Sequence, residues 1–238
     1  MQLADWLAEG PFTLAMSSGF FSFFAHTGML GALAARGFAP SAVSGSSAGA
    51  LVGGAYAAGL PIDELAERLF ALRRDDFWDP APGLGLLAGR KFDALLREML
   101  PVTTMRECGV PIAISAFAIA KRRTEVLHDV DLAHAIRASC AVPGMFHPVR
   151  IGVRAYWDGG ILDRPGLAGV AAGARVLCHH IANGDAPPRR DGLVALVIED
   201  LPRSGPFALD AGRRALDEAR QRTTHALETE IAGGVVRL

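Results

Sequence analysis

The sequence predicts an α/β protein in which helices cover both faces of a mostly parallel β-sheet. Short apolar segments typical of buried strands alternate with longer segments of helical pattern, and this order produces parallel sheets. The composition fits a compact chain, because 50% of the 238 residues are apolar and 21% are charged. One hydrophobic core suffices at this length, so we expect residues 1–238 to form a single domain.

Two strand-turn-helix units are expected at the start of the chain. In each, a short apolar strand runs into a turn of small residues, and a helix follows. The expected strands are 12–16 and 42–44, and the expected helices are 25–36 and 48–58. An amphipathic helix is expected at 62–73, and 77–89 is rich in Pro, Gly and large apolar residues, which indicates a loop or lid.

The remaining elements continue the alternation of strands and helices. The expected strands are 110–120, 123–128, 154–157, 175–181 and 193–199, and the expected helices are 91–100, 131–139 and 207–231. A polar loop at 183–190 separates the last two strands.

Two uncharged runs, 10–35 and 37–62, have the length of membrane spans. Gly, Ser and Thr interrupt the first run, and Gly, Pro and Ser interrupt the second. Acidic rather than basic residues precede the first, so we interpret both as buried strand-turn-helix units and not as a span or signal peptide. Three cysteines without a CxxC spacing indicate neither disulfides nor zinc. We therefore expect a cytoplasmic protein. The apolar residues of the loop 77–87 are compatible with transient docking on a membrane surface, and an ordinary buried loop is the alternative.

Charge and histidine spacing exclude several further classes of partner. The chain has 24 Lys+Arg against 25 Asp+Glu, so it carries no general attraction for nucleic acid. His26, His128, His134, His147 and His225 have no metal-ligand spacing, and we expect neither a metal nor a cofactor. The sequence leaves the oligomeric state open.

The best candidate for a nucleophile is Ser47. Gly45-Ser46-Ser47-Ala48-Gly49 matches G-x-S-x-G, in which a strand turns sharply into a helix and exposes the middle serine. Small flanking residues allow that turn, and the helix N-terminus favours negative charge beside the serine. A glycine-rich turn without catalytic function has the same local pattern, but the apolar strand before it and the small-residue helix after it favour the nucleophile.

A serine hydroxyl needs a base, and Asp158 in Asp158-Gly159-Gly160 is the candidate. A third turn, at Ser18, Gly19 and Phe20, follows the first strand and is a candidate oxyanion hole, because several backbone N–H groups can point to one position there. Taken alone, each of these two segments is also compatible with an ordinary turn.

Together the motifs resemble the patatin-like phospholipase family over about residues 12–165. The resemblance rests on four segments in the family's order: Leu14–Phe20, Gly45–Gly49, Ala138–Pro143 with Phe146 and Pro148, and Asp158–Gly160. It implies a three-layer α/β/α fold, a Ser47–Asp158 dyad without histidine, and hydrolysis of lipid acyl esters.

The sequence departs from the family in the loop after the first strand. The family usually has a Gly-rich loop followed by an Arg, whereas this chain has Phe20 at the third Gly and Ser22 at the Arg. Backbone N–H groups persist without glycine, so an oxyanion hole is still expected, but a fixed positive charge is lost.

Two alternatives stay open at this point. An α/β-hydrolase with a Ser-Asp-His triad would use the same elbow with His179 or His180, although residue 47 is early for a fold that places several strands before its serine. A lipid-binding protein could also keep the fold without turnover.

Overall fold

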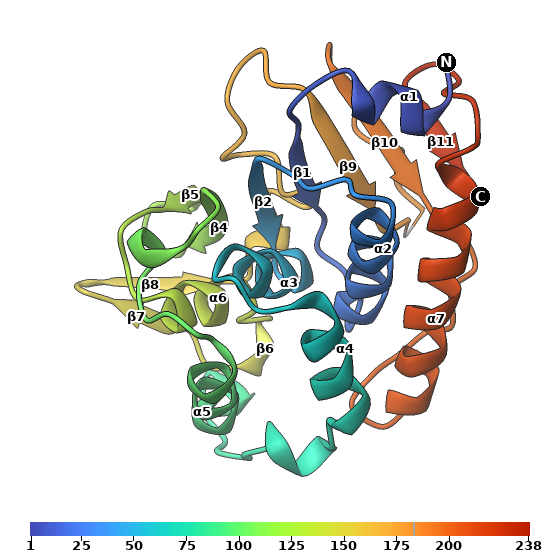
Figure 1. Cartoon of the computed structure of the whole chain (residues 1–238). Coiled ribbons are helices and arrows are strands. Elements are labelled where there is room, and N and C mark those ends of the chain that lie inside the picture. Colours follow the sequence, from blue (N-terminus) through green and yellow to red (C-terminus); the bar gives the residue numbers. More distant parts are fainter. Residues whose placement is uncertain (183) are drawn as a thin grey trace.

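The computed structural model describes residues 1–182 and 184–238, which form a nine-stranded sheet with helices packed against it (Figure 1). Asn183, the first residue of the loop expected at 183–190, lies outside the described residues. The strands are β1 (Thr13–Met16), β2 (Ala42–Ser46), β4 (Ile112–Ala118), β5 (Arg123–Leu127), β7 (Val149–Ile151), β8 (Arg154–Trp157), β9 (Val176–His180), β10 (Leu193–Val197) and β11 (Val235–Arg237).

The sheet is mostly parallel. Its order is β11-β10-β9-β1-β2-β4-β8-β7, with β5 also paired to β4. Strands β11 to β4 in this order are parallel to one another, while β5, β7 and β8 form the antiparallel end. Two further strands, β3 (Gly85–Leu87) and β6 (Gly144–Phe146), pair separately from this sheet.

The helices are α1 (Leu3–Ala8), α2 (Phe23–Ala35), α3 (Ala48–Ala57), α4 (Ile62–Ala71), α5 (Arg90–Met99), α6 (Leu132–Ser139) and α7 (Leu209–Ala226), with single 3-10 turns at Arg74–Asp76, Met105–Glu107 and Gly159–Ile161. Among the described residues, six of the seven helices correspond to expected helices, and α1 is the exception. The last helix ends five residues earlier than expected, and the chain then turns at Gly233 and Gly234, both with positive φ, into β11.

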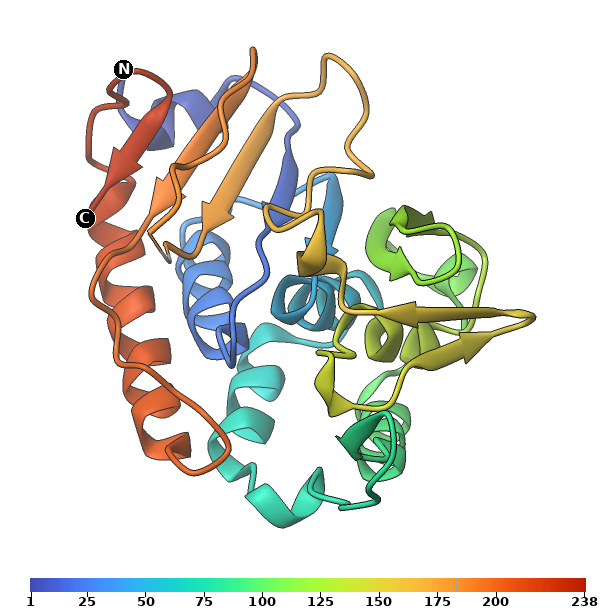
Figure 2. The ribbon, with the colours of Figure 1, turned by 180° about the vertical axis from the view of Figure 1, so that it is seen from behind.

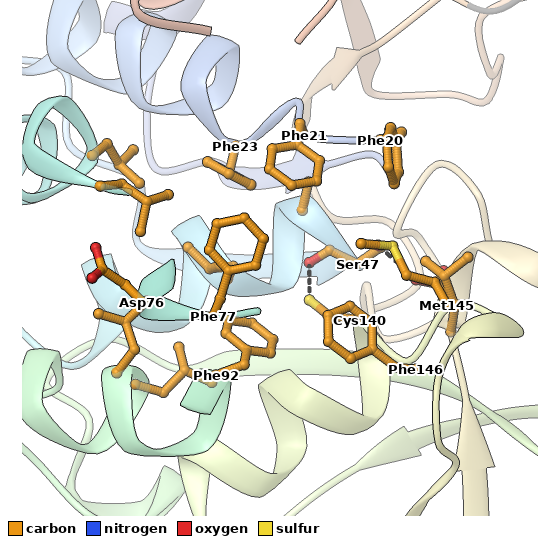
Figure 3. A pocket seen from close by; sticks show the side chains of 18 of the residues that line it. Phe20, Phe21, Phe23, Ser47, Asp76, Phe77, Phe92, Cys140, Met145 and Phe146 are labelled. Carbon is orange, nitrogen blue, oxygen red and sulfur yellow. Dashed lines mark hydrogen bonds between the residues drawn. The ribbon is translucent and has the colours of Figure 1, made fainter. Parts of the chain in front are cut away.

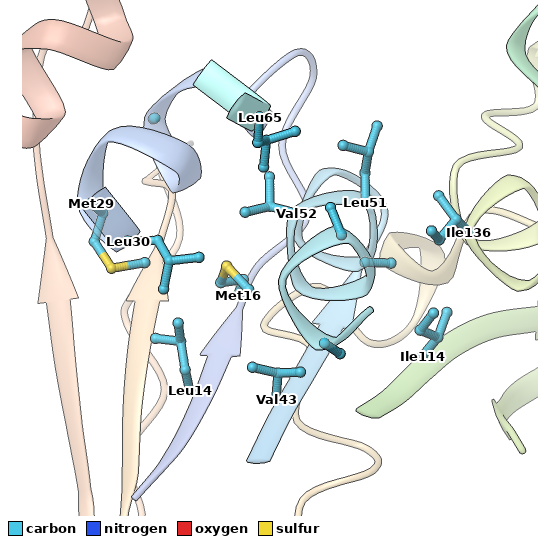
Figure 4. Packing of buried hydrophobic residues seen from close by; sticks show 14 of the residues in the cluster. Leu14, Met16, Met29, Leu30, Val43, Leu51, Val52, Leu65, Ile114 and Ile136 are labelled. Carbon is cyan, nitrogen blue, oxygen red and sulfur yellow. The ribbon is translucent and has the colours of Figure 1, made fainter. Parts of the chain in front are cut away.

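The core lies on two faces of the sheet because successive strand residues point in opposite directions. Leu14 and Met16 enter the main cluster, where α2 and α3 cover the sheet (Figure 4). Ala15 enters a smaller cluster with side chains of β9 and β10, covered by the partly buried Leu167 and Val170. The connection that carries these two residues runs across that side of the sheet (Figure 2).

The two uncharged runs are explained by this core. The first folds as β1 and α2 and the second as β2 and α3, and the helices of both units are almost entirely buried. Among the described residues, none of the helices combines the length and apolar character needed to cross a bilayer. Burial against other protein elements, rather than lipid, accounts for their composition.

The segment expected as a loop or lid is more structured than its composition indicates. Within 77–89, β3 pairs with β6, a strand 59 residues further along the chain. Phe77 and Leu87 are buried, whereas Leu84 and Leu86 are exposed. The segment is therefore anchored at both ends and presents two leucines to solvent.

Candidate active site

Ser47 occupies the sharp turn that the sequence predicts. It lies between β2 and α3 with φ 52° and ψ −116°, a combination that non-glycine residues rarely adopt. Its N–H donates to Ser139 Oγ at 2.8 Å, and that hydroxyl donates to the Ser115 carbonyl oxygen at 2.7 Å. Ser139, to which the sequence analysis gave no role, thus links the strained turn to β4.

Asp158 is held directly opposite the serine hydroxyl. Ser47 Oγ donates to Asp158 Oδ2 at 2.7 Å, and the Gly160 N–H donates to Oδ1 at 2.7 Å. The backbone of Asp158 is fixed by its N–H, which donates to the Ala141 carbonyl oxygen at 2.9 Å. A side chain on Gly159 would collide with the Ser115 carbonyl oxygen, which explains the glycine after the aspartate.

The environment of Asp158 alters its acidity. The side chain is buried, and desolvation raises its pKa to about 6, although the hydrogen bonds from Ser47 and Gly160 act in the opposite direction. A carboxylate with this pKa is a stronger base than an exposed aspartate and is still mostly ionised at neutral pH. Asp158 can therefore accept a proton from Ser47.

The loop between β1 and α2 lies beside these two residues, but its three predicted donors differ. The Ser18 N–H donates to the Arg164 carbonyl oxygen at 2.7 Å, so this N–H is already engaged. Within the described part of the chain, the N–H groups of Gly19 and Phe20 have no recorded acceptor. The positive φ falls on Phe21, at 56°. Gly19 and Phe20 are thus the better candidates for an oxyanion hole.

A cavity of about 890 Å³ adjoins the pair, and both Ser47 and Asp158 line it. Aromatic side chains from several elements point into it, as Figure 3 shows for Phe21, Phe77 and Phe146. Helices α4 and α5 contribute ten of the 31 residues that line it. The sequence predicts an amphipathic helix at 62–73 and a helix at 91–100, but it does not indicate that the two helices border a cavity.

Cys140 lies against the same turn. Its Sγ donates to the Ser47 carbonyl oxygen at 3.2 Å (Figure 3). Burial raises the pKa of this thiol well above its usual value, and the nearby Asp158 carboxylate acts in the same direction. The thiol is therefore neutral and is not a competing nucleophile. All three cysteines are free: Cys178 is buried, and Cys108 and Cys140 are partly exposed as whole residues.

The histidines of the alternative triad have other contacts. His179 Nδ1 lies 2.8 Å from His26 Nδ1, and His180 Nε2 lies 3.5 Å from Asp185 Oδ1. The residues that line the cavity beside Ser47 include neither His179 nor His180.

A family model described as patatin-like phospholipase matches residues 14–171. The chain belongs to the patatin-like phospholipase family. The matched residues include the loop after β1, Ser47 and Asp158, so the resemblance stated from these motifs is confirmed.

Curated relatives of this patatin-like protein include uncharacterized NTE family proteins of Mycobacterium bovis and Mycobacterium tuberculosis. Each is 32% identical to it over 215 residues, which is 86% of this chain and 59% of the relative. The chain thus spans less than two thirds of the length of these relatives.

Solved structures confirm the predicted fold class of the patatin-like chain. VipD from Legionella pneumophila superposes with a TM-score of 0.56 at 14% identity, covering 91% of this chain and 66% of VipD. The type III effector ExoU of Pseudomonas aeruginosa superposes with a TM-score of 0.50 at 14% identity, covering 91% of this chain and 52% of ExoU.

Proposed function

We propose that this chain is a serine acyl hydrolase that cleaves fatty acyl esters of lipids with a Ser47–Asp158 dyad. The observation that carries the proposal is the 2.7 Å hydrogen bond from Ser47 Oγ to Asp158 Oδ2 in the wall of an apolar cavity of about 890 Å³. A nucleophile in direct contact with a base of raised pKa is the arrangement that acyl transfer needs.

In the proposed reaction, Asp158 Oδ2 accepts the hydroxyl proton as Ser47 Oγ forms a bond to the ester carbonyl carbon. The carbonyl electron pair moves to its oxygen, where the N–H groups of Gly19 and Phe20 stabilise the negative charge. Collapse of this intermediate breaks the ester C–O bond, and the leaving alcohol takes the proton from Asp158. Water, deprotonated by Asp158, then attacks the acyl-enzyme and releases the fatty acid, and Ser47 recovers its proton.

The cavity supports a lipid substrate. Its aromatic wall offers an acyl chain an apolar environment, and burial of each methylene contributes about 0.8 kcal/mol. Two of the residues that line it, Phe20 and Ile161, are also exposed to solvent, at 56% and 41%. We propose that this apolar opening makes transient contact with a lipid surface, from which the acyl chain enters.

A matched pair of serine variants tests the dyad. Ser47→Ala removes the nucleophile and should lower the hydrolysis of a long-chain acyl ester at least about a thousandfold. Ser46→Ala is the control, because the Ser46 hydroxyl is buried next to Ser47 and is among the groups without a hydrogen-bond partner. It should retain activity, and both variants should melt at about the temperature of the parent protein.

A fluorophosphonate probe separates the enzyme from the lipid-binding alternative. The parent protein and Ser46→Ala should be labelled at Ser47, whereas Ser47→Ala and Asp158→Asn should not. An unlabelled parent protein that still binds long-chain lipid would favour the non-catalytic alternative. Full activity in Ser47→Ala would refute the proposed nucleophile.

A further inference from the structure

Two buried histidines lie beneath the loop that carries Gly19 and Phe20. His26 is in the first turn of α2, His179 is near the end of β9, and both are fully buried. His26 Nε2 is 2.8 Å from the Ser17 carbonyl oxygen, and its Nδ1 is 2.8 Å from His179 Nδ1. The rings meet edge to face, at an interplanar angle of 85°. The pair thus connects the end of β9 to the last residue before the loop.

The chemistry of these contacts determines where the protons lie. Burial lowers the pKa of His26 to about 4 and holds that of His179 well below its usual value, so both rings are neutral at pH 7. A carbonyl oxygen only accepts, so His26 carries its proton on Nε2, and its Nδ1 is an acceptor. His179 must then donate from Nδ1. Its Nε2 becomes the acceptor without a partner, in agreement with the buried, unbonded Nε2 in the structure.

The backbone N–H, the carbonyl oxygen and the hydroxyl of Ser17 are all hydrogen-bonded in this arrangement. Its N–H donates to the His179 carbonyl oxygen at 3.2 Å, its carbonyl oxygen accepts from His26, and its Oγ accepts from the Ile181 N–H at 2.8 Å. The loop 18–22 follows Ser17 and leads into α2, on which His26 lies. Both ends of the loop are therefore connected by one side-chain hydrogen bond.

We infer that His26 and His179 are positioning residues that hold the N–H groups of Gly19 and Phe20 in place for the oxyanion; this inference rests on the proposed function. His179 donates to His26 and so keeps it in the tautomer that donates to Ser17. Two apolar side chains could fill the same space, but they would leave the Ser17 carbonyl oxygen buried without a donor. His180 takes no part, because its Nε2 lies near Asp185.

Paired amide substitutions test the inference, because Asn places an N–H near the Nδ1 position of histidine and Gln places one near Nε2. His179→Asn keeps the donor to His26 and should keep kcat within about threefold, whereas His179→Gln should lower kcat at least about tenfold. At position 26 the order reverses, since Gln reaches Ser17 and Asn does not. KM for a long-chain ester should change less than about threefold in all four variants.

Every outcome of this series decides the inference. A mere loss of packing would affect Asn and Gln alike, so equal losses at a position overturn it, as does unchanged kcat in all four variants. Complete loss in both His179 variants would favour histidine as a base. If a variant fails to fold, ¹⁵N NMR of the parent protein shows which ring nitrogens carry protons. Protonation of His26 on Nδ1, or of His179 on Nε2, would overturn the positioning role.

The proposed function fails separately from this inference. Retained activity in Ser47→Ala refutes the dyad whatever the histidine variants do. If Ser47 is labelled by the fluorophosphonate and the parent protein is active, unchanged kcat in the histidine variants refutes only the positioning role.

Discussion

The acidity of Asp158 sets the pH at which a dyad of this kind works. Its pKa is raised to about 6 by burial, and only the ionised carboxylate can accept the Ser47 proton. About one tenth of the molecules have this carboxylate ionised at pH 5, and about nine tenths at pH 7. We therefore expect kcat/KM for a soluble ester to rise about tenfold from pH 5 to pH 7 and then to level off.

The measurement is a pH-rate profile on a short-chain ester that does not itself titrate in this range. His179→Asn should give the same apparent pKa as the parent protein, because that histidine lies outside the cavity wall. A profile that stays flat down to pH 5 would contradict the proposed role of Asp158 as base.

Candidate site residues that lie within one short contiguous motif could be predicted from the sequence. Ser47 and Asp158 each lie in a short motif of glycines and small residues that reports the local turn. The residues that hold the site in place do not lie in such motifs. Ser139, which accepts from the Ser47 N–H, is 92 residues from it, and His26 and His179, which lie beneath the loop after β1, are 153 residues apart. Their contacts depend on the register of β1 with β9 and on the packing of α6, which local patterns do not contain.

Among the elements, the long buried units were the most predictable. Strands β1 and β2 and helices α2 and α3 were expected because apolar runs and glycine turns coincide there. Three-residue strands such as β3, β6 and β11 carry too few side chains to show a period, and only pairing with distant strands stabilises them. The six-residue helix α1 was not predicted, because a segment this short also shows too little of a helical period.

Helix α3 packs so closely on β1 that one of its glycines is structurally required. A side chain on Gly49 would collide with the Met16 carbonyl oxygen, which is backbone and has little freedom to move. We expect Gly49→Ala to destabilise the protein by about 1–3 kcal/mol, measured by urea unfolding, and to reduce activity by displacing Ser47.

Gly53→Ala in the same helix is the matched control. Its new Cβ would lie 3.2 Å from Met16 Cε, the flexible end of a side chain. Because alanine favours helix over glycine by about 1 kcal/mol, this variant should be neutral or slightly more stable. Equal stability of the two variants would show that the close approach at Gly49 is not limiting.

At the scale of the whole molecule, the candidate site lies where neighbouring parallel strands end. The loop after β1 and the turn after β2 both leave the carboxyl edge of the sheet, and the chain after β8 brings Asp158 to the same place. Helices α4 and α5, which are not part of the sheet, form another side of the cavity. The sequence predicted the elements, but the enclosure results from their packing.

The opening of this cavity leads to a prediction about lipid surfaces that rests on the proposed function. Phe207 is 74% exposed, and its ring lies 5.5 Å from that of Trp78, the neighbour of the cavity-lining Phe77. Burial of a phenylalanine in lipid contributes about 1.5–3 kcal/mol, or roughly tenfold or more in affinity. Phe207→Glu should therefore weaken binding to phosphatidylcholine vesicles about tenfold, measured by cosedimentation, and slow hydrolysis of vesicle-borne lipid. Hydrolysis of a soluble short-chain ester should stay within about twofold.

Val153→Glu is the control, because Val153 is 98% exposed at the tip of the β7–β8 hairpin (Figure 2), and this substitution should affect neither measurement. Equal effects of the two substitutions on vesicle binding would place the contact elsewhere on the molecule.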